Sequence, residues 1–287
     1  MRSPVHNAYN ARMEVCRRSG AWGARRVGKM TLPYSINSVE QKVRQALALA
    51  DFYSAHGRRV IPLLDFEDMK GQRIMKKCVI VGAGVCDSGQ LRKRAVIKEG
   101  DLCIAADGGL DYLLEVGITP DIVLGDMDSL RTREALAALS VKRLPEEKDD
   151  TDMLAAIKEG LSAGFRKFEL YGALGGRLDH TLANIQSLLY LLNRGARGTL
   201  YGDGLSVFLI RNESISFVAD EAKCGRRISV FAFGGDADGV SEVGLKYTLD
   251  HVLLKQEFPV GVSNEFTGGH AMIEVQNGML LICMEIK

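Results

Sequence analysis

The sequence DIVLGDMDS, residues 121–129, is the stretch from which the fold and the chemistry of the chain are most readily argued. Its apolar run IVL is typical of the end of a buried strand, and Gly125 then permits a tight turn. Asp126 and Asp128 follow two residues apart, so their carboxylates share one face if the backbone stays extended. Two carboxylates at the carboxyl end of a strand predict a site for a divalent cation, and hard oxygen ligands suit Mg²⁺. A solvated acidic turn is the competing interpretation of this stretch taken alone.

The chain has 287 residues, which is enough for one large or two ordinary domains. No apolar run approaches the roughly 18 to 20 residues of a membrane span. The six cysteines are scattered without a CxxC pair, which favours a reduced, cytoplasmic protein over a zinc site or a disulfide framework. Residues 1–76 carry 14 basic and 6 acidic side chains, whereas the remainder carries 23 and 30. The acidic main body is therefore not expected to bind nucleic acid or a membrane.

Residues 1–75 are predicted to be a basic N-terminal extension without catalytic residues. The apolar spacing within residues 37–56 predicts one amphipathic helix. Met69 and Met75 both lie close to the first expected strand, so translation from an upstream start is one interpretation of the extension. A mitochondrial-type presequence is another, because the first 35 residues are rich in Arg and poor in acids.

From Cys78 onward, apolar strand-like runs alternate with helical stretches. The expected strands lie within residues 78–84, 102–109, 121–129, 141–144, 167–176 and 198–204, and the helices between them include residues 151–163 and 179–192. This alternation predicts a parallel sheet covered on both faces, that is, a Rossmann-like α/β catalytic domain over residues 76–204. The glycines GAG after the first strand lack the full GxGxxG spacing, so a nicotinamide site is not favoured.

The pattern changes after Gly204, where short β-rich segments with alternating hydrophobicity follow one another. They predict an all-β sandwich domain over residues 205–287. Asn277-Gly278 predicts a hairpin turn within it.

Polar clusters follow four of the expected parallel strands, and a parallel sheet brings the carboxyl ends of its strands to one edge. The clusters are Asp107 to Gly109, then Asp126 and Asp128, then Lys148 to Asp152, and finally Gly175 to His180. Each has a structural alternative: an Asx turn, an acidic turn, a capped helix start and a glycine hinge. Convergence of this much negative charge, balanced only by Lys148 and Arg177, nevertheless predicts divalent cations bound with a polyphosphate. Arg177 suits phosphate oxygens, and the glycines allow close approach of the backbone.

These motifs resemble those of the thiamine pyrophosphokinase family. The matching segments are ADGG (106–109), TPDIVLGDMDS (119–129), DDTD (149–152), GALGGRLDHTLAN (172–184), GLKYTL (244–249) and SNEF (263–266). The resemblance covers the chain from about Cys78 onward and rests on the common order of several motifs, none of which is specific alone.

The resemblance implies an enzyme that moves the β,γ-pyrophosphoryl group of ATP to the hydroxyl of thiamine, giving thiamine diphosphate and AMP. It implies a homodimer with the active site at the interface, and Mg²⁺ held by Asp126, Asp128 and Asp152. It places Arg177 with these catalytic residues. The remaining implied binding residues are Asp107, Gly108, Lys148, Asp149, Thr151 and Asp179 for ATP and its metal, and Ser263 and Asn264 for thiamine.

The chain departs from the family in one respect. Eukaryotic members place an aromatic residue, commonly Trp, over the thiamine rings, whereas the single Trp here is Trp22 in the extension. Tyr247, Phe258 and Phe266 remain open as replacements. His180 is interpreted as a residue of the helix start rather than a base.

Two other functions remain open at this point. Another Mg²⁺-dependent phosphotransferase or phosphohydrolase on the same scaffold would use the same acidic cluster, but the GLKY and SNEF segments favour the thiamine kinase. A non-catalytic thiamine or nucleotide binding protein is the third interpretation. A binding protein of this kind has no need of three crowded carboxylates at one edge of a sheet, which argues against this interpretation.

Overall fold

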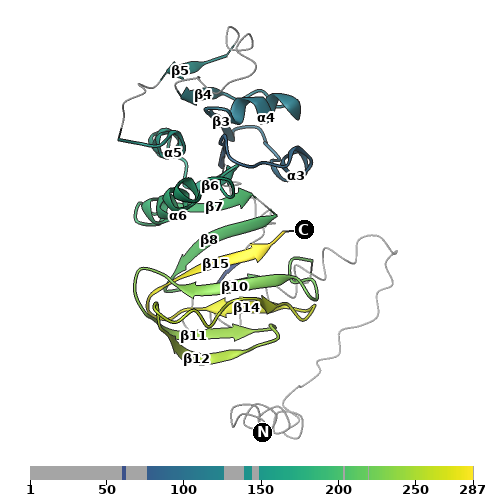
Figure 1. The fold of residues 1–287 in the computed structure, drawn as a ribbon, viewed down its shortest axis with the longest axis vertical. Coiled ribbons are helices and arrows are strands. Elements are labelled where there is room, and N and C mark those ends of the chain that lie inside the picture. Colours follow the sequence, from purple (N-terminus) through teal and green to yellow (C-terminus); the bar gives the residue numbers. More distant parts are fainter. Residues whose placement is uncertain are drawn as a thin grey trace, which may run out of the picture. The chain divides into compact units, whose positions relative to one another are not determined.

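A computed structural model describes residues 60–62, 76–125, 139–143, 149–202, 204–218 and 220–286 of the chain. The predicted helix in residues 37–56 lies outside this part, as do Asp126, Asp128 and Lys148. Two sheets organise the described residues, one of ten strands and one of five (Figure 1).

Six of the ten strands of the larger sheet pair in parallel, and they are the six strands predicted for the α/β domain. These are β2 (Cys78–Val81), β3 (Leu102–Ala106), β4 (Ile122–Gly125), β5 (Val141–Arg143), β6 (Lys167–Tyr171) and β7 (Arg197–Gly202). They lie in the order β7-β6-β2-β3-β4-β5, so the chain adds strands on one side of β2 and then returns to its other side at β6. The strands β2, β3 and β4 are mostly buried because helices cover both faces, which explains their uninterrupted apolar runs.

Four helices cover this parallel half: α3 (Ser88–Arg94), α4 (Gly109–Glu115), α5 (Asp152–Ser162) and α6 (Leu178–Leu192). Leu91 of α3 and Leu110 of α4 pack on one face of the sheet, and Ile157 of α5 and Leu188 of α6 pack on the other. Figure 1 shows the two pairs of helices on opposite sides of the strands. The predicted helices at 151–163 and 179–192 are confirmed to within a residue at each end.

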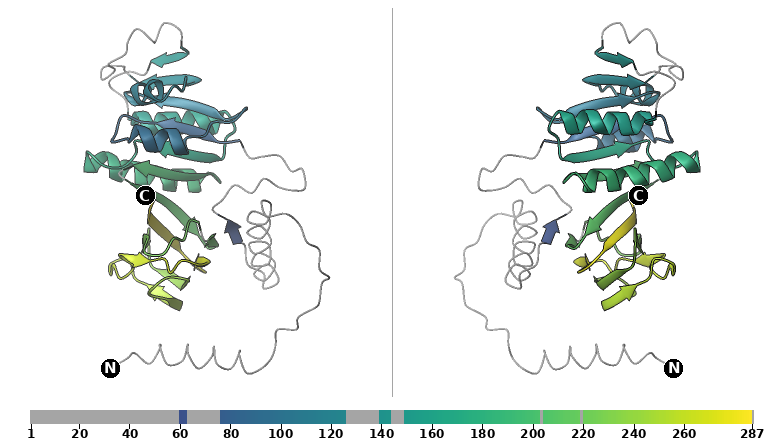
Figure 2. Two further views of the ribbon diagram at one scale, coloured as in Figure 1. Left: turned by 90° about the vertical axis from the view of Figure 1, so that its right-hand side faces the viewer. Right: turned by 90° about the vertical axis from the view of Figure 1, so that its left-hand side faces the viewer.

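The ten-stranded sheet continues from β7 into antiparallel strands. These are β8 (Leu205–Arg211), β15 (Met279–Glu285), β10 (Arg227–Ala232) and β13 (Asn264–Glu265), in the order β7-β8-β15-β10-β13. The second sheet holds β1 (Val60–Pro62), β9 (Ser214–Phe217), β14 (Ala271–Glu274), β11 (Ala237–Val243) and β12 (Leu249–Leu254), in the order β1-β9-β14-β11-β12. Figure 2 follows the larger sheet from its blue and teal parallel strands to its green and yellow antiparallel ones.

The core of the antiparallel region lies between the two sheets. Ile210, Val230 and Ile282 face it from the larger sheet, and Phe217 and Ile273 face it from the smaller one. The predicted β-sandwich is therefore confirmed. The domain limits at residues 75 and 204 stay predictions, although pairing does change from parallel to antiparallel between β7 and β8.

The predicted hairpin at Asn277-Gly278 is wrong. The turn follows β14 and precedes β15, but these strands belong to different sheets and pair with other partners. Gly278 does take a positive φ of 116°, and its amide donates to the side chain of Asn212 at 2.8 Å. The turn signal was thus correct, but the apolar faces of the two strands pack on each other across the core, so the chain crosses between sheets.

An ion pair joins the parallel and antiparallel regions. Arg197 of β7 donates through Nη1 and Nη2 to the two carboxylate oxygens of Glu213, at 2.6 and 2.5 Å. Glu213 is buried in the turn between β8 and β9 and also accepts from the Arg211 amide at 3.2 Å.

Among the described helices, none is long and apolar enough to cross a membrane.

We expect Arg197→Met to lower the free energy of unfolding by about 2 kcal/mol, because it leaves the buried Glu213 carboxylate without its counter-ion. Urea unfolding at pH 7 measures the change. The matched control is Arg227→Met. Arg227 donates through Nε to Glu285 at 2.7 Å, but the Glu285 side chain is 30% exposed, whereas the Glu213 side chain is only 6% exposed. A surface pair of this kind contributes less than about 1 kcal/mol. Equal losses in the two variants would contradict a special role for the Arg197 pair.

Candidate active site

Tight contacts between backbones shape the edge where β2, β3 and β6 end. A Cβ on Gly109 would lie 1.8 Å from the Val81 carbonyl oxygen, and one on Gly84 would lie 2.3 Å from that of Gly172. Gly172 itself has a φ of 61°. The glycines in the ADGG and GALGG segments are therefore required for loops after neighbouring strands to pack against one another.

Asp107 and Gly108 follow β3 and lie beside the end of β4. The Asp107 amide donates to the Leu124 carbonyl at 2.7 Å, and a Cβ on Gly125 would meet the Cα of Asp107 at 3.1 Å. Asp107 has a φ of 51°, and Gly108 is the N-cap of α4. Asp126 follows Gly125 directly in sequence, so the turn at Asp107 adjoins the start of the segment predicted to hold the metal.

The DDTD segment forms the start of α5. Thr151 is its N-cap and accepts from the Leu154 amide at 3.2 Å. Met153 packs on Gly82, since a Cβ there would lie 2.8 Å from its Cε, so this helix start lies at the carboxyl end of β2. Asp152 is half-buried in the first turn, and Asp149 is exposed before it.

Asp150, by contrast, pairs with the helix that it precedes. Both of its carboxylate oxygens accept from Lys158, at 2.7 and 2.6 Å, and this hydrogen bond raises the pKa of the Lys158 ammonium. The sequence places these two residues eight apart, too far for the usual helical pairing rules to predict it.

Arg177 and Asp179 meet at the start of α6. The guanidinium donates from Nε to Oδ1 at 3.1 Å and from Nη2 to Oδ2 at 2.5 Å, and both side chains are exposed. This hydrogen bond lowers the pKa of the Asp179 carboxyl. His180 lies in the first turn of α6, as predicted. Arg177 is thus held at the surface beside the loop of residues 174–177, with its donors directed at Asp179.

Asn184 holds this loop in place, a role that was not predicted. It is buried on α6, and its Nδ2 donates to the Ala173 carbonyl at 2.8 Å. An Asn on the inward face of an otherwise apolar helix was the signal that would have identified it.

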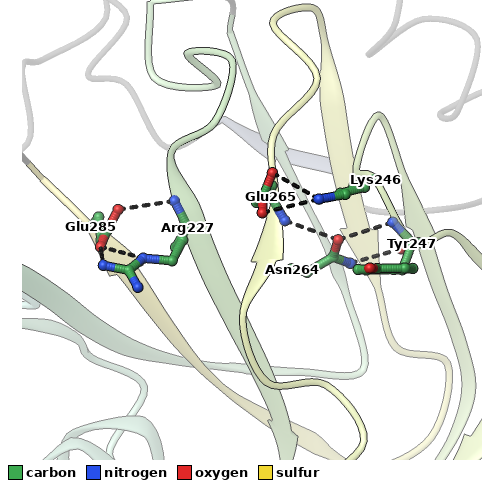
Figure 3. Close-up of polar contacts among 6 residues, drawn as sticks. All are labelled: Arg227, Lys246, Tyr247, Asn264, Glu265 and Glu285. Carbon is green, nitrogen blue, oxygen red and sulfur yellow. Dashed lines mark hydrogen bonds and ion pairs between the residues drawn. The ribbon is translucent and has the colours of Figure 1, made fainter.

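Asn264 is the centre of a hydrogen-bond network in the β-sandwich (Figure 3). Its Oδ1 accepts from the amides of Tyr247 and Glu265 at 3.0 and 2.9 Å. Its Nδ2 donates to the Tyr247 carbonyl at 2.7 Å and to Oε2 of Glu242 at 2.9 Å. The amide of Asn264 therefore fixes the backbone of Tyr247 on both sides.

Ser263, which precedes Asn264, has a φ of 59°, is exposed, and donates through its amide to the hydroxyl of Ser229 at 3.0 Å. Of the three aromatic candidates, Phe266 is 1% exposed and packs edge-to-face on Phe217 in the core. Tyr247 and Phe258 are exposed. The structure leaves these two as rings that a ligand can reach.

Glu242 on β11 completes the network. It is 1% exposed, and its buried Oε1 has no hydrogen-bond partner among the residues that the structure describes. Burial raises the pKa of its carboxyl to about 7, and the bond from Asn264 partly offsets this effect. An acid in a sandwich core next to a predicted ligand residue is the second feature that the sequence did not predict.

Asp107, Asp149 and Asp152 carry carboxylates just before or at the starts of α4 and α5, and carboxylate oxygens are chemically suited to a hard cation. Within the described ranges, no three His, Cys, Asp or Glu side chains gather closely enough to form a metal site on their own. Asp126 and Asp128, which are also predicted to hold the metal, lie outside the described ranges. An acidic sheet edge beside a glycine loop and an arginine is characteristic of enzymes that act on phosphate groups.

Comparison with known proteins identifies the family. A model of the thiamin pyrophosphokinase catalytic domain matches residues 94–200, and a model of the thiamin pyrophosphokinase vitamin B1 binding domain matches residues 214–280. Together they cover more than half of the chain. The chain belongs to the thiamin pyrophosphokinase family.

Individual relatives agree. The thiamine pyrophosphokinase of Bacillus subtilis is 29% identical over 188 residues, which cover 64% of this chain and 87% of that protein. The crystal structure of the Bacillus subtilis enzyme covers 73% of this chain and 99% of its own, with a TM-score of 0.66 at 27% identity. A 6-hydroxymethyl-7,8-dihydropterin pyrophosphokinase of Pyrococcus furiosus is 33% identical over 124 residues, or 42% of this chain and 50% of that protein.

Proposed function

We propose that this chain is an ATP:thiamine diphosphotransferase that forms thiamine diphosphate and AMP. The match of residues 214–280 to a vitamin B1 binding domain carries the choice of thiamine as acceptor. The alternatives, another phosphotransferase or phosphohydrolase and a non-catalytic binding protein, lack a comparable observation.

The edge of the parallel sheet would bind the triphosphate. The loop of residues 174–177 allows an anion to approach the backbone, because Gly175 and Gly176 carry no side chains and have φ values of 82° and 68°. Arg177 would exchange its bond to Asp179 for phosphate oxygens, and Lys148 would contribute a second positive charge. Thr151 holds the start of α5, whose positive dipole end also attracts phosphate.

Asp126, Asp128 and Asp152 would hold Mg²⁺, with Asp107 and Asp149 at the same edge. When bound, Mg²⁺ would supply positive charge that neutralises the charge developing on the phosphates during transfer. The nucleophile is a neutral alcohol, so the chain must aim it at the β-phosphorus and accept its proton, and a carboxylate of this cluster is suited to that role.

The thiamine residues would act in a partner subunit. Asn264 begins β13, and six strands separate β13 from β3 in the sheet: β10, β15, β8, β7, β6 and β2. Seven steps of about 4.8 Å between strands amount to roughly 30 Å, too far for one small acceptor to span. Ser263 and Asn264 would therefore serve the phosphate edge of a second copy, and this separation supports the proposal of a homodimer with its active site at the interface.

Exposed apolar residues support the same conclusion. Phe258, Val260 and Val262 lead up to Ser263 and are 51–65% exposed, and Leu178 and Leu182 are exposed beside Arg177. Clusters of this kind next to predicted binding residues mark interfaces. We propose a cytoplasmic protein, with thiamine and ATP as its substrates.

Turnover tests the proposal directly. Purified full-length protein, ATP and Mg²⁺ are mixed with or without thiamine, and AMP, ADP and thiamine diphosphate are quantified. We expect AMP to appear only with thiamine and in equal amount to thiamine diphosphate. A parallel reaction with 6-hydroxymethyl-7,8-dihydropterin should give no AMP. ADP as product, or AMP only with the pterin, would contradict the proposal.

A further inference from the structure

The strand β1 belongs to the N-terminal extension, which is predicted to lack catalytic residues. Residues 60–62 pair in parallel with β9, and the register sets Ile61 opposite Ile215. On its other side β9 pairs with β14, so β1 is the outermost strand at this end of the five-stranded sheet. The extension therefore contributes a strand to the sandwich, although the two segments lie far apart in sequence.

The backbone of β9 is directed alternately to β14 and to β1. Glu213, directly before β9, accepts through its carbonyl from the Val275 amide at 3.0 Å, and Val275 directly follows β14. Successive residues of a strand direct their peptide groups to opposite sides, so Ile215 also faces β14, whereas Ser214 and Ser216 face β1. Ser214 is only 2% exposed with β1 in place. An unpaired peptide group at such a buried position would be costly.

The sequence of β1 suits one orientation on this edge. Proline has no amide hydrogen, and edge strands accept it where its nitrogen is directed away from the neighbouring strand. Pro62 then faces away from β9, and by the same alternation Ile61 faces β9. In a parallel pair, such a residue bonds to the residues on either side of its register partner, which for Ile61 is Ile215. Ile61 thus lies between Ser214 and Ser216, the two residues of β9 whose peptide groups are directed toward β1.

This strand lies outside the part of the chain that the family models cover. The two models match nothing before residue 94. The Bacillus subtilis structure uses 99% of its own chain to cover 73% of this one, so about a quarter of this chain has no counterpart there. The extension is basic and the remainder of the chain is acidic, and these opposite charges favour docking of the extension on its own molecule.

We propose that the outer edge of β9 is a docking surface for an extended strand in parallel orientation, and that residues 60–62 of the same chain occupy it. This docking is independent of the proposed catalytic function. A chain translated from Met69 or Met75 would lack β1 and leave the edge open, and open edges recruit strands from other molecules. The extension thereby determines whether this edge of the sandwich is closed or available to a second strand.

Ile61→Pro in the full-length protein tests the docking, because it removes the amide that faces β9. Native-state hydrogen exchange, followed by NMR, should show the Ser216 amide exchanging at least about tenfold faster than in the wild type. The Ile215 amide, which faces β14, should keep its protection and so report that the sheet is intact. Val60→Pro is the matched control, since by the same alternation Val60 faces away from β9, and the Ser216 amide should stay protected.

A peptide with the sequence of residues 56–65 gives a second measurement. It should bind the Ile61→Pro protein and slow exchange of the Ser216 amide again, but it should not bind the wild type, whose edge is already occupied. The same peptide with Ile61→Pro should bind neither protein. Unchanged exchange of Ser216 in the Ile61→Pro protein, or equal binding of the peptide to wild type and variant, would overturn the proposal. Protection of Ser216 that rises with the concentration of the wild type would overturn occupancy by the same chain and assign the strand to a second copy.

Discussion

Asp126→Asn should lower kcat by at least about a hundredfold while the protein stays folded. Removal of one group that stabilises charge in a transition state typically costs roughly 10²–10³ in rate, and Asn retains the shape of Asp without its charge. Gly125 lies against the backbone of Asp107, so the segment that begins at Asp126 adjoins the acidic edge of the sheet. Steady-state production of AMP with thiamine, together with a thermal melt, measures both parts of the prediction.

Asp121→Asn is the matched control, since Asp121 belongs to the same DIVLGDMDS segment but lies before β4. Its Oδ2 accepts from the Cys103 amide at 2.8 Å, which gives it a structural role. We expect the control to melt at a lower temperature and to keep its kcat within about twofold. Normal turnover in Asp126→Asn would refute the metal assignment, whatever the control does.

We expect the wild-type protein to become less stable as the pH rises through the titration of Glu242, and the Glu242→Gln variant to show no such decrease. The pKa of the Glu242 carboxyl is raised by burial from 4.5 to about 7 in the folded protein. Between these two values the folded state holds a proton that the unfolded state has released, so the free energy of unfolding falls as the pH increases. The two and a half pKa units correspond to about 3 kcal/mol, fully lost above pH 7.

Urea unfolding at pH 5 and pH 8 measures this difference. Near pH 5 most of the stabilisation is still present and Gln resembles the protonated acid, so the variant and the wild type should have similar stability. At pH 8 the variant should be more stable by about 2–3 kcal/mol. Glu265→Gln is the control, since Glu265 pairs with Lys246 near the surface and should contribute less than about 1 kcal/mol at either pH. Identical pH profiles for wild type and Glu242→Gln would contradict the prediction.

The strands and helices of the α/β region could be predicted because each is encoded locally. Apolar runs such as CVIV and LCIAA are followed within two residues by a glycine, and the DDTD segment carries its own N-cap in Thr151. The pairing of Asp150 with Lys158, the core position of Phe266 and the network around Asn264 could not be predicted. They depend on which surfaces face each other after folding, and periodicity within one segment does not contain that information.

The same reasoning applies to the error at Asn277-Gly278, where a local turn signal was correct but the sheet assignment was not. For the site, the order of motifs identified Asp107, Thr151, Arg177 and Asp179, which the structure places at strand ends or helix starts of the parallel half. Their assigned roles toward ATP stay predictions. The roles assigned to Asp126, Asp128 and Lys148 also stay predictions, since these residues lie outside the described part of the chain.

The position of β15 between β8 and β10 has a consequence for how the protein is made. A nascent chain that has reached only residue 278 has β8 without its outer partner, and the run VFLI at residues 207–210 is then a bare hydrogen-bonding edge. Edges of this kind recruit strands from other molecules, which leads to aggregation. Ribosome stalling or premature termination shortly before β15 would therefore produce a fragment with an exposed strand edge that favours aggregation.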